Sequence, residues 1–417
     1  MVESMTGANE AKNTHKIFLT AFLVRLAMLV IIVLVGGNMV KGFVDATIYY
    51  DDYRYELGAK RYAEHAEQLL DVDAFTRAFD SVGDKTGHFL ENPIDHTPLW
   101  YWIVCFLMYL TKTFLSVRLL NILLASLAVV YVYKFAYDLY GEKVARLSAG
   151  LLTFLPYPVL FSCFAYKDQL VMLITFYLLY QSYHFRLNRA IPRVSVLGVI
   201  LGVITLMLIR GGLSSILFVI CLLIAFQDVF KNLFREKPGK LKLAIMIIVV
   251  VVVVAILIRS SGTIIYKLKY YLHQYENTAS GASISALTMT SLTQVYKLPF
   301  AYIFSMVMPI GLNTAWTSWY ALVAHLNVLM TPVAVGAGLF FFKRKQNWFT
   351  YLLCLGYYMI SIVTSLNIFR HYYSLIPLSL MFFSAYYTEA DKKKKIILFV
   401  LAGLFSLLLV GYYIFKG

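Results

Sequence analysis

Long apolar runs separated by short polar stretches dominate the chain. Runs of about 20 residues, the length that crosses a bilayer as a helix, recur eleven times. They lie near residues 17–40, 116–137, 145–163, 168–185, 195–209, 212–230, 242–259, 320–342, 348–366, 372–388 and 396–415. Two further apolar stretches, 98–115 and 299–312, are ambiguous by length alone.

The basic residues decide how these runs are threaded through the membrane. If neither ambiguous stretch crosses, five loops that share one face carry 17 Lys and Arg, and the opposite face after residue 111 carries ten. Cytoplasmic loops are enriched in Lys and Arg, so the first face is cytoplasmic. We therefore predict eleven spans with the N-terminus inside and the C-terminus outside. Two apolar helices would lie in or dip into the outer interface, within outer loops 41–115 and 260–312.

Composition supports this interpretation. The chain has 417 residues, of which 60% are hydrophobic and only 14% charged, with a mean hydropathy of +0.71. The predicted fold class is therefore an all-α polytopic membrane protein. The net charge of +15 comes from clusters between apolar runs and does not indicate nucleic-acid binding. The first run exceeds a signal-peptide core and lacks a cleavage site, so we expect it to stay as an anchor. The four cysteines lie in apolar segments, without a disulfide framework or a CxxC metal site.

The first outer loop is unusually acidic. Residues 41–97 contain twelve of the 22 acidic residues and only six Lys and Arg. A stripe of Tyr55, Ala59, Tyr62, Ala66 and Leu69 predicts a helix that lies along the membrane surface. The second outer loop contains a Ser/Thr-rich stretch that is typical of a flap. The sequence shows no clear internal repeat, which weakens the case for a transporter built from inverted halves.

Asp51 and Asp52 stand side by side where the chain leaves the first apolar run. One interpretation is a helix N-cap, because a carboxylate there accepts backbone N–H bonds and meets the positive end of the helix dipole. The other is a general base, because adjacent carboxylates near apolar surface raise each other's pKa. One residue can serve both purposes, so both interpretations stay open here.

Other polar residues lie at the predicted outer ends of spans. His96 precedes the apolar stretch 98–115, whose Trp and Tyr residues suit interfacial anchoring, and it could bind phosphate or a metal. Lys167 and Asp168 separate two spans, where Asp168 could simply cap a helix. Arg210 and Arg370 run against the positive-inside bias, so they either snorkel or bind an anionic headgroup or a substrate phosphate.

The order of these motifs resembles that of a known family. The first span is followed by Asp51-Asp52-Tyr53-Arg54-Tyr55, then by His96-Thr97-Pro98-Leu99-Trp100-Tyr101-Trp102, Arg118-Leu119-Leu120-Asn121 and Lys167-Asp168. This order is similar to membrane glycosyltransferases of the GT-C fold, the relatives of protein O-mannosyltransferases and lipid A aminoarabinose transferases. Thr97 stands where that family usually has proline. Arg370-His371-Tyr372 resembles its late Arg-Tyr segment in interrupted form. The resemblance covers residues 17–190.

The resemblance implies a fold and its division into regions. The fold would be a GT-C-like bundle of about eleven transmembrane helices, with juxtamembrane helices in the first outer loop. Residues 1–16 would be a cytoplasmic tail, residues 17–190 the catalytic core that includes loop 41–115, and residues 191–417 a variable transmembrane region with outer loop 260–312. Relative to that family, we expect the chain to lack a soluble C-terminal domain, which leaves acceptor recognition open.

The resemblance also implies a reaction. A sugar would pass from a polyprenyl-phosphate donor to a glycan, lipid or protein acceptor on the extracytoplasmic face of the plasma membrane. Asp51, with Asp52 beside it, would be the catalytic carboxylate. The implied donor-phosphate ligands are Arg210, Arg370 and Lys167, and the implied substrate contacts are Tyr55, His96, Asp168 and Tyr372. Some relatives use a divalent cation, which stays open as a cofactor because no clear ligand set is visible here.

Two other functions fit part of the pattern. A polysaccharide polymerase or ligase that uses a diphosphate-linked oligosaccharide would share the outer arginines but would not depend on Asp51. A transporter of lipid-linked sugars would need polar or broken spans near the midplane, whereas the charges here lie at span ends. The glycosyltransferase is the preferred hypothesis.

Overall fold

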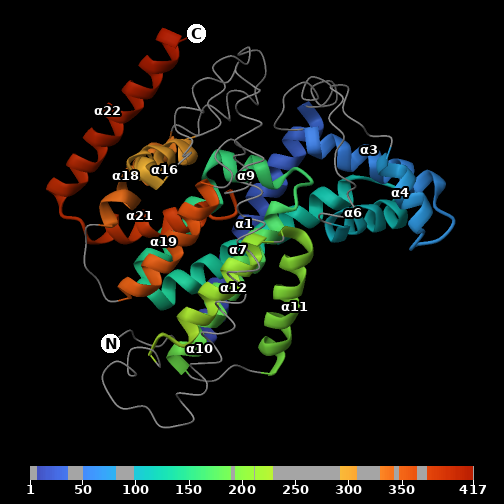
Figure 1. The fold of residues 1–417 in the computed structure, drawn as a ribbon, viewed down its shortest axis with the longest axis horizontal. Coiled ribbons are helices and arrows are strands. Elements are labelled where there is room, and N and C mark those ends of the chain that lie inside the picture. The colour runs from blue at the N-terminus through green and yellow to red at the C-terminus, as the bar shows by residue number, and fades with distance from the viewer. Residues whose placement is uncertain are drawn as a thin grey trace.

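The described part of the chain is built from helices alone. In the computed structural model these residues are 7–35, 50–80, 98–188, 193–210, 212–228, 292–307, 329–341, 347–363 and 373–416, and they contain no strand. Figure 1 shows a bundle of helices with a smaller helical unit that projects from one side. The fold class is therefore all-α, as the sequence predicts, while the predicted count of eleven spans extends beyond the described segments.

The helices follow the apolar runs closely. Their bounds are α1 Gly7–Val35, α3 Tyr50–His65, α4 Val72–Asp80, α6 Pro98–Thr111, α7 Leu115–Tyr140, α8 Glu142–Phe154, α9 Pro156–Ser162, α10 Asp168–Asn188, α11 Arg193–Arg210, α12 Gly212–Ala225, α16 Leu298–Val307, α18 Thr331–Phe340, α19 Trp348–Val363, α21 Ile376–Glu389 and α22 Lys392–Lys416, with a 3-10 turn at Leu292–Lys297. The predicted span at 242–259 lies outside the described residues.

Helix α7 forms the centre of the bundle. It packs against α10, α8 and α1, and α10 in turn packs against α12 (Figure 1). Arg25, in the middle of α1, is fully buried there. Its guanidinium donates to the backbone oxygens of Ala21 at 3.1 Å and Leu152 at 3.0 Å. A cation inside an apolar bundle is costly unless it is satisfied in this way, so Arg25 ties α1 to α8.

The predicted span at 145–163 was wrong as one continuous helix. The structure has two helices there, α8 and α9, separated at Leu155. Leu155 is extended, with φ −62° and ψ 126°, because the residue that precedes a proline is disfavoured in the helical region. Pro156 then starts α9, where its missing N–H costs nothing. This break turns the chain toward the loop that precedes α10.

Helices α3, α4 and α6 form the projecting unit in Figure 1. The stripe predicted from the sequence is buried at Tyr55, Ala59 and Tyr62. Helix α3 ends at His65, however, so Ala66 and Leu69 of the stripe lie beyond it. Where the chain turns after α3, the Tyr62 hydroxyl donates to the Leu69 carbonyl at 2.7 Å.

An aromatic cluster holds this unit together. The Phe75 ring on α4 stacks on the Trp102 ring of α6, with centroids 4.0 Å apart. Tyr55 of α3 meets Tyr101 edge to face at 5.0 Å, and Phe79 meets Tyr101 at 4.8 Å. Aromatic pairs of this kind contribute beyond the area they bury, so α6 serves as the floor on which α3 and α4 pack.

Gly58→Ala should destabilise the projecting unit. A Cβ at residue 58 would collide with the Phe79 ring. Overpacking of a tight contact costs about 1–3 kcal/mol, so we expect a lower Tm in detergent. Gly150→Ala in α8 is the matched control, because a Cβ there meets nothing within 4 Å. That variant should be neutral or stabilised by up to about 1 kcal/mol. Equal Tm values for the two variants would contradict the packing described for α3 and α4.

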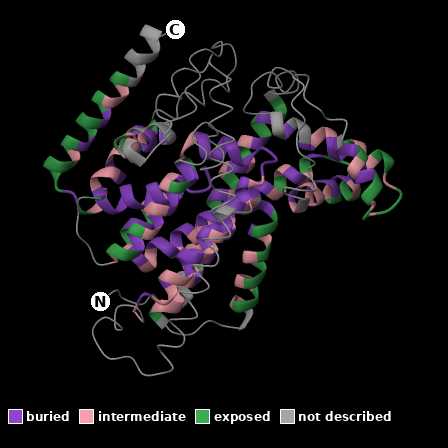
Figure 2. Ribbon diagram, in the orientation of Figure 1, coloured by how far each residue is buried: buried purple, intermediate pink, exposed green. Residues whose placement is uncertain are grey.

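Apolar side chains on the outer helices face away from the bundle. Figure 2 shows exposed residues along α11 and α22 and at the tip of the projecting unit. Large exposed hydrophobic residues include Leu34 of α1 at 78% exposure, Leu197 of α11 at 58% and Leu408 of α22 at 70%. Two described helices are long and apolar enough to cross a bilayer, Lys12–Leu34 and Leu115–Tyr140, and several shorter helices are also apolar. Apolar surface of this extent suits contact with lipid and indicates a membrane protein.

Candidate functional site

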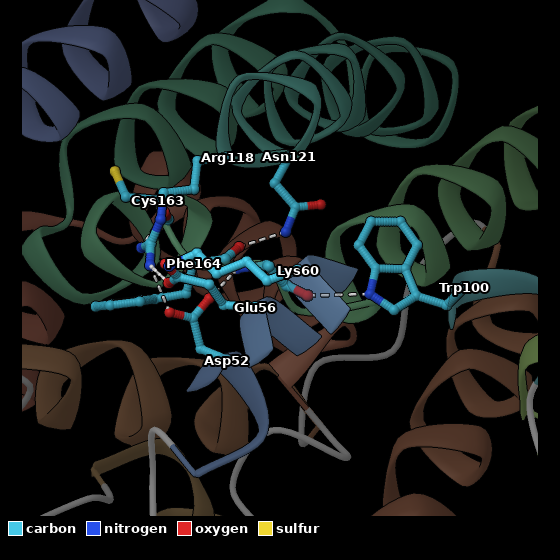
Figure 3. Close-up of polar contacts among 9 residues, drawn as sticks. Asp52, Glu56, Lys60, Trp100, Arg118, Asn121, Cys163 and Phe164 are labelled. Carbon is cyan, nitrogen blue, oxygen red and sulfur yellow. Dashed lines mark hydrogen bonds and ion pairs between the residues drawn. The ribbon is translucent and has the colours of Figure 1, made fainter. Parts of the chain in front are cut away.

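The loop between α9 and α10 is fixed by side chains from two other helices. Four consecutive backbone carbonyls of this buried loop accept hydrogen bonds from side chains. The loop has no regular structure, so these side chains replace the donors that a helix would supply. Arg118 donates to Cys163 O at 3.3 Å, Asn121 to Phe164 O and to Tyr166 O at 3.0 Å, and Trp100 to Ala165 O at 3.0 Å. Figure 3 shows these donors converging on the loop from α6 and α7.

Asp52 joins this loop from α3. Its side chain is 8% exposed, and Nη2 of Arg118 lies 2.7 Å from its Oδ2. The backbone N–H of Ala165 donates to its Oδ1 at 2.6 Å. Both oxygens are therefore engaged by groups outside α3 (Figure 3). These contacts hold the first turn of α3 against α7 and the loop.

Opposing influences act on the Asp52 carboxyl. Burial is the largest, and it raises the pKa of Asp52 above its ordinary value. The Arg118 guanidinium and the Ala165 N–H lower the pKa, whereas the negative charge of Glu56 raises it. Glu56 lies one helical turn after Asp52, with Oε2 at 3.6 Å from Arg118 Nη2. The net direction of the pKa of Asp52 is upward, because burial outweighs the attraction of Arg118.

Glu56→Gln should lower the pKa of Asp52, because it removes the neighbouring negative charge. A hydrophobic carbodiimide labels only the protonated carboxyl. As the pH rises, we therefore expect labelling of Asp52 to decline at a lower pH in this variant than in the wild type. The labelled fraction would be measured by mass spectrometry across a pH series. Glu142→Gln, an exposed change in a distant ion pair with Arg146, should leave the midpoint unchanged. An unchanged or raised midpoint in Glu56→Gln would contradict the arrangement.

A second charged group lies at the start of α10. Asp168 is buried, and its Oδ1 is 3.8 Å from Nη2 of Arg210 at the end of α11. Nη1 of Arg210 donates to the Ser374 hydroxyl at 2.7 Å. Lys167 directly precedes Asp168 and attracts it electrostatically. The structure thus brings three predicted site residues together, namely Lys167, Asp168 and Arg210.

The structure describes the surroundings of only some of the remaining predicted site residues. Asp51 lies in the first turn of α3, and its side chain is outside the described part of the structure. His96, Arg370 and Tyr372 are also outside the described residues. Tyr55 is 3% exposed and packs on Tyr101. Its predicted contact with substrate stays a prediction.

From the sequence, Arg118 and Asn121 stand in a family-like motif but have no predicted role in the site, and Glu56 is not singled out. The spacing of these residues in the sequence could have identified them. Arg118 and Asn121 are polar residues three apart at the start of an apolar span, and Glu56 follows Asp52 by four, so each pair shares one helix face. The backbone groups of Cys163 to Tyr166 could not have been found in this way, because any residue can supply them.

Metal binding was left open by the sequence. Within the ranges that the structure describes, no group of three His, Cys, Asp or Glu residues is arranged to hold a metal ion. Asp52 is engaged by Arg118 and the backbone N–H of Ala165, and Asp168 faces Arg210.

Comparison with known proteins gives one family. The sequence model of the dolichyl-phosphate-mannose-protein mannosyltransferase family matches residues 95–258. No curated protein and no solved structure gives a significant match. The match begins just before α6 and includes Arg118, Asn121, the 163–167 loop and Arg210. It confirms the resemblance drawn from the motifs, and it supports a membrane glycosyltransferase of the mannosyltransferase type.

Proposed function

We propose that this protein transfers a sugar from a polyprenyl-phosphate carrier to a hydroxyl acceptor at the extracytoplasmic face of the membrane. The acceptor is a glycan, a lipid or a protein. The family match supports the glycosyltransferase class. The engagement of the first turn of α3 with the loop before α10 supports the position of the site.

That engagement is the observation on which the proposal rests. The Asp52 carboxylate binds the backbone N–H of Ala165, which lies 113 positions along the chain and three residues before Asp168. Asp168 in turn faces Arg210. The Asp52 carboxylate, Lys167 and Arg210 therefore lie around one short loop, and this supports a site there for transfer from a phosphate to a hydroxyl.

In the proposed reaction Asp51 accepts the proton of the acceptor hydroxyl. The hydroxyl oxygen attacks the anomeric carbon, and the bond from that carbon to the phosphate oxygen breaks. The electron pair leaves with the polyprenyl phosphate, and the configuration inverts. Lys167, Arg210 and Arg370 stabilise the negative charge that grows on the phosphate. Asp52 holds the start of α3 through Arg118 and Ala165, so that Asp51 stays beside the loop.

Substrate contacts complete the proposed site. His96, Tyr55 and Tyr372 are proposed to line the sugar and acceptor region, and Asp168 to orient Arg210. The lipid tail would remain in the bilayer, where the exposed apolar faces of the outer helices already place the protein. A donor delivered in this way requires no soluble nucleotide-binding domain.

A transfer assay with purified protein in liposomes tests the proposal. Radiolabelled polyprenyl-phosphate mannose is supplied with a mixture of peptides and cell-envelope glycans, and a polyprenyl-phosphate pentose is tested in parallel. We expect label to appear in a covalent product from at least one phosphate-linked donor, and none from GDP-mannose. Transfer only from a diphosphate-linked oligosaccharide would indicate a polymerase or ligase instead. Movement of the labelled lipid across the liposome without product would indicate a transporter.

A further inference from the structure

One peptide group connects Asn121 to Asp52. The peptide between Phe164 and Ala165 accepts a hydrogen bond at its carbonyl from Nδ2 of Asn121. The same peptide donates its N–H to Oδ1 of Asp52 at 2.6 Å. Asn121 is fully buried on α7, and its Nδ2 also reaches the Tyr166 carbonyl at 3.0 Å. Figure 3 shows Asn121 and Asp52 on opposite sides of the loop.

Hydrogen bonds that share a peptide reinforce one another. A donor at the carbonyl pulls electron density toward the oxygen and makes the N–H at the other end of the peptide a better donor. The better donor then stabilises a negative charge on its acceptor. The effect is stronger away from water, and both Asn121 and Asp52 are buried.

The neighbouring contacts act on different groups. Trp100 donates to the carbonyl of the next peptide, at Ala165, and Arg118 donates to the preceding carbonyl, at Cys163. Neither bond is made to the peptide whose N–H contacts Asp52. Asn121 is therefore the side chain placed to polarise that peptide.

We propose that Asn121 is a positioning residue that acts through the Phe164–Ala165 peptide to hold Asp52 in its ionised form. This inference deepens the proposed function, on which its catalytic meaning rests. An ionised Asp52 keeps its pair with Arg118, and this pair fixes the start of α3 where Asp51 lies. Asn121 thus links the central helix of the bundle to the carboxylate pair without touching substrate.

Other titratable groups also act on Asp52 and enter the test. Arg118 from α7 favours the ionised carboxylate, and Glu56 from α3 itself opposes it. From the loop, Tyr166 interacts electrostatically with Asp52. All three remain in place when only residue 121 is changed.

The test measures protonation of Asp52 directly in the full-length protein. Asn121→Leu keeps the side-chain size and removes both donated bonds. Modification of Asp52 by dicyclohexylcarbodiimide, located by mass spectrometric fragmentation, is followed against pH. We expect modification to persist to higher pH, with a roughly twofold to fivefold higher rate above the wild-type midpoint. Asn121→Ser, which keeps a polar group but cannot reach both carbonyls, should show a change in the same direction if the leucine variant does not fold.

Three variants serve as controls. Ser126→Ala removes a buried hydroxyl on α7 that bonds only within its own helix, and it should leave the labelling profile unchanged. Trp100→Phe should alter the rate less than Asn121→Leu. Glu56→Gln should move the profile the opposite way, which shows that the probe responds.

The outcomes separate this inference from the proposed function. A folded Asn121→Leu protein with a wild-type labelling profile would overturn the role of Asn121, whatever the result of the sugar-transfer assay. A wild-type protein that transfers no sugar, together with the expected labelling shift, would remove the proposed function and the catalytic meaning of the link. The electrostatic link itself would still stand in that case.

Discussion

Asp51→Asn should abolish sugar transfer while the protein still folds and inserts. The amide keeps the size of the side chain but cannot accept the acceptor's proton at neutral pH. Loss of a general base lowers rates by about 10²–10⁴-fold. The measurement is single-turnover transfer from radiolabelled polyprenyl-phosphate mannose, with Tm and chromatographic elution as checks on folding.

Two further variants make this result specific. Asp73→Asn, an exposed acid on α4 in the same outer loop, should retain activity. Asp52→Asn should lower both activity and Tm, because it also breaks the contact with Arg118. Full transfer by Asp51→Asn would remove the proposed base. Equal loss of Tm in Asp51→Asn and Asp52→Asn would mean that Asp51 serves the fold instead.

Arg118→Met should give the largest loss of stability. Arg118 pairs with Asp52 at 2.7 Å, and both side chains are largely buried. Removing one partner leaves an uncompensated charge, which typically costs about 3–5 kcal/mol. The variant should therefore have a markedly lower Tm in detergent at neutral pH. The surface pair of Arg146 and Glu142 offers a matched control, because Arg146→Ala there should cost at most about 1 kcal/mol.

The loss in Arg118→Met should shrink as the pH falls. Arg118 lowers the pKa of Asp52, so its removal raises that pKa further above the unfolded value. A carboxyl whose pKa is raised by folding binds more protons in the folded state, and stability then falls as pH rises from the unfolded pKa through the folded pKa.

The double variant completes this test. Adding Asp52→Asn to Arg118→Met removes the buried charge and should recover much of the stability. If Arg118→Met were no less stable than Arg146→Ala, the buried pair would not hold α3 in place.

The sequence predicted the helices well where an apolar run has spanning length. Residues 116–137 and 168–185 became α7 and α10 with small changes at their ends. It also identified the short helix at 98–115, which the structure places as α6 at Pro98–Thr111. It failed at 145–163, because hydropathy continues through Pro156 although the helix cannot. Local backbone sterics decided that break.

The candidate site was only partly predictable. Asp52, Asp168 and Arg210 carry charge at the ends of apolar runs. A charged side chain in such a place is unusual, so the sequence alone marks these residues as candidates for the site. Their partners were not predictable, because Asp52 meets the backbone N–H of Ala165 and Arg210 meets the Ser374 hydroxyl. Backbone and hydroxyl groups carry no signal of their own along the chain.

The sequence alone determined the class of protein, the approximate helices and the acidic segment after the first apolar run, because hydropathy and charge are properties of local stretches. Only the tertiary structure decided which carboxylate is paired, which loop it meets and how Asn121 reaches it through a shared peptide. Those contacts join residues more than 40 positions apart, and their energies depend on burial, which arises only when the helices pack.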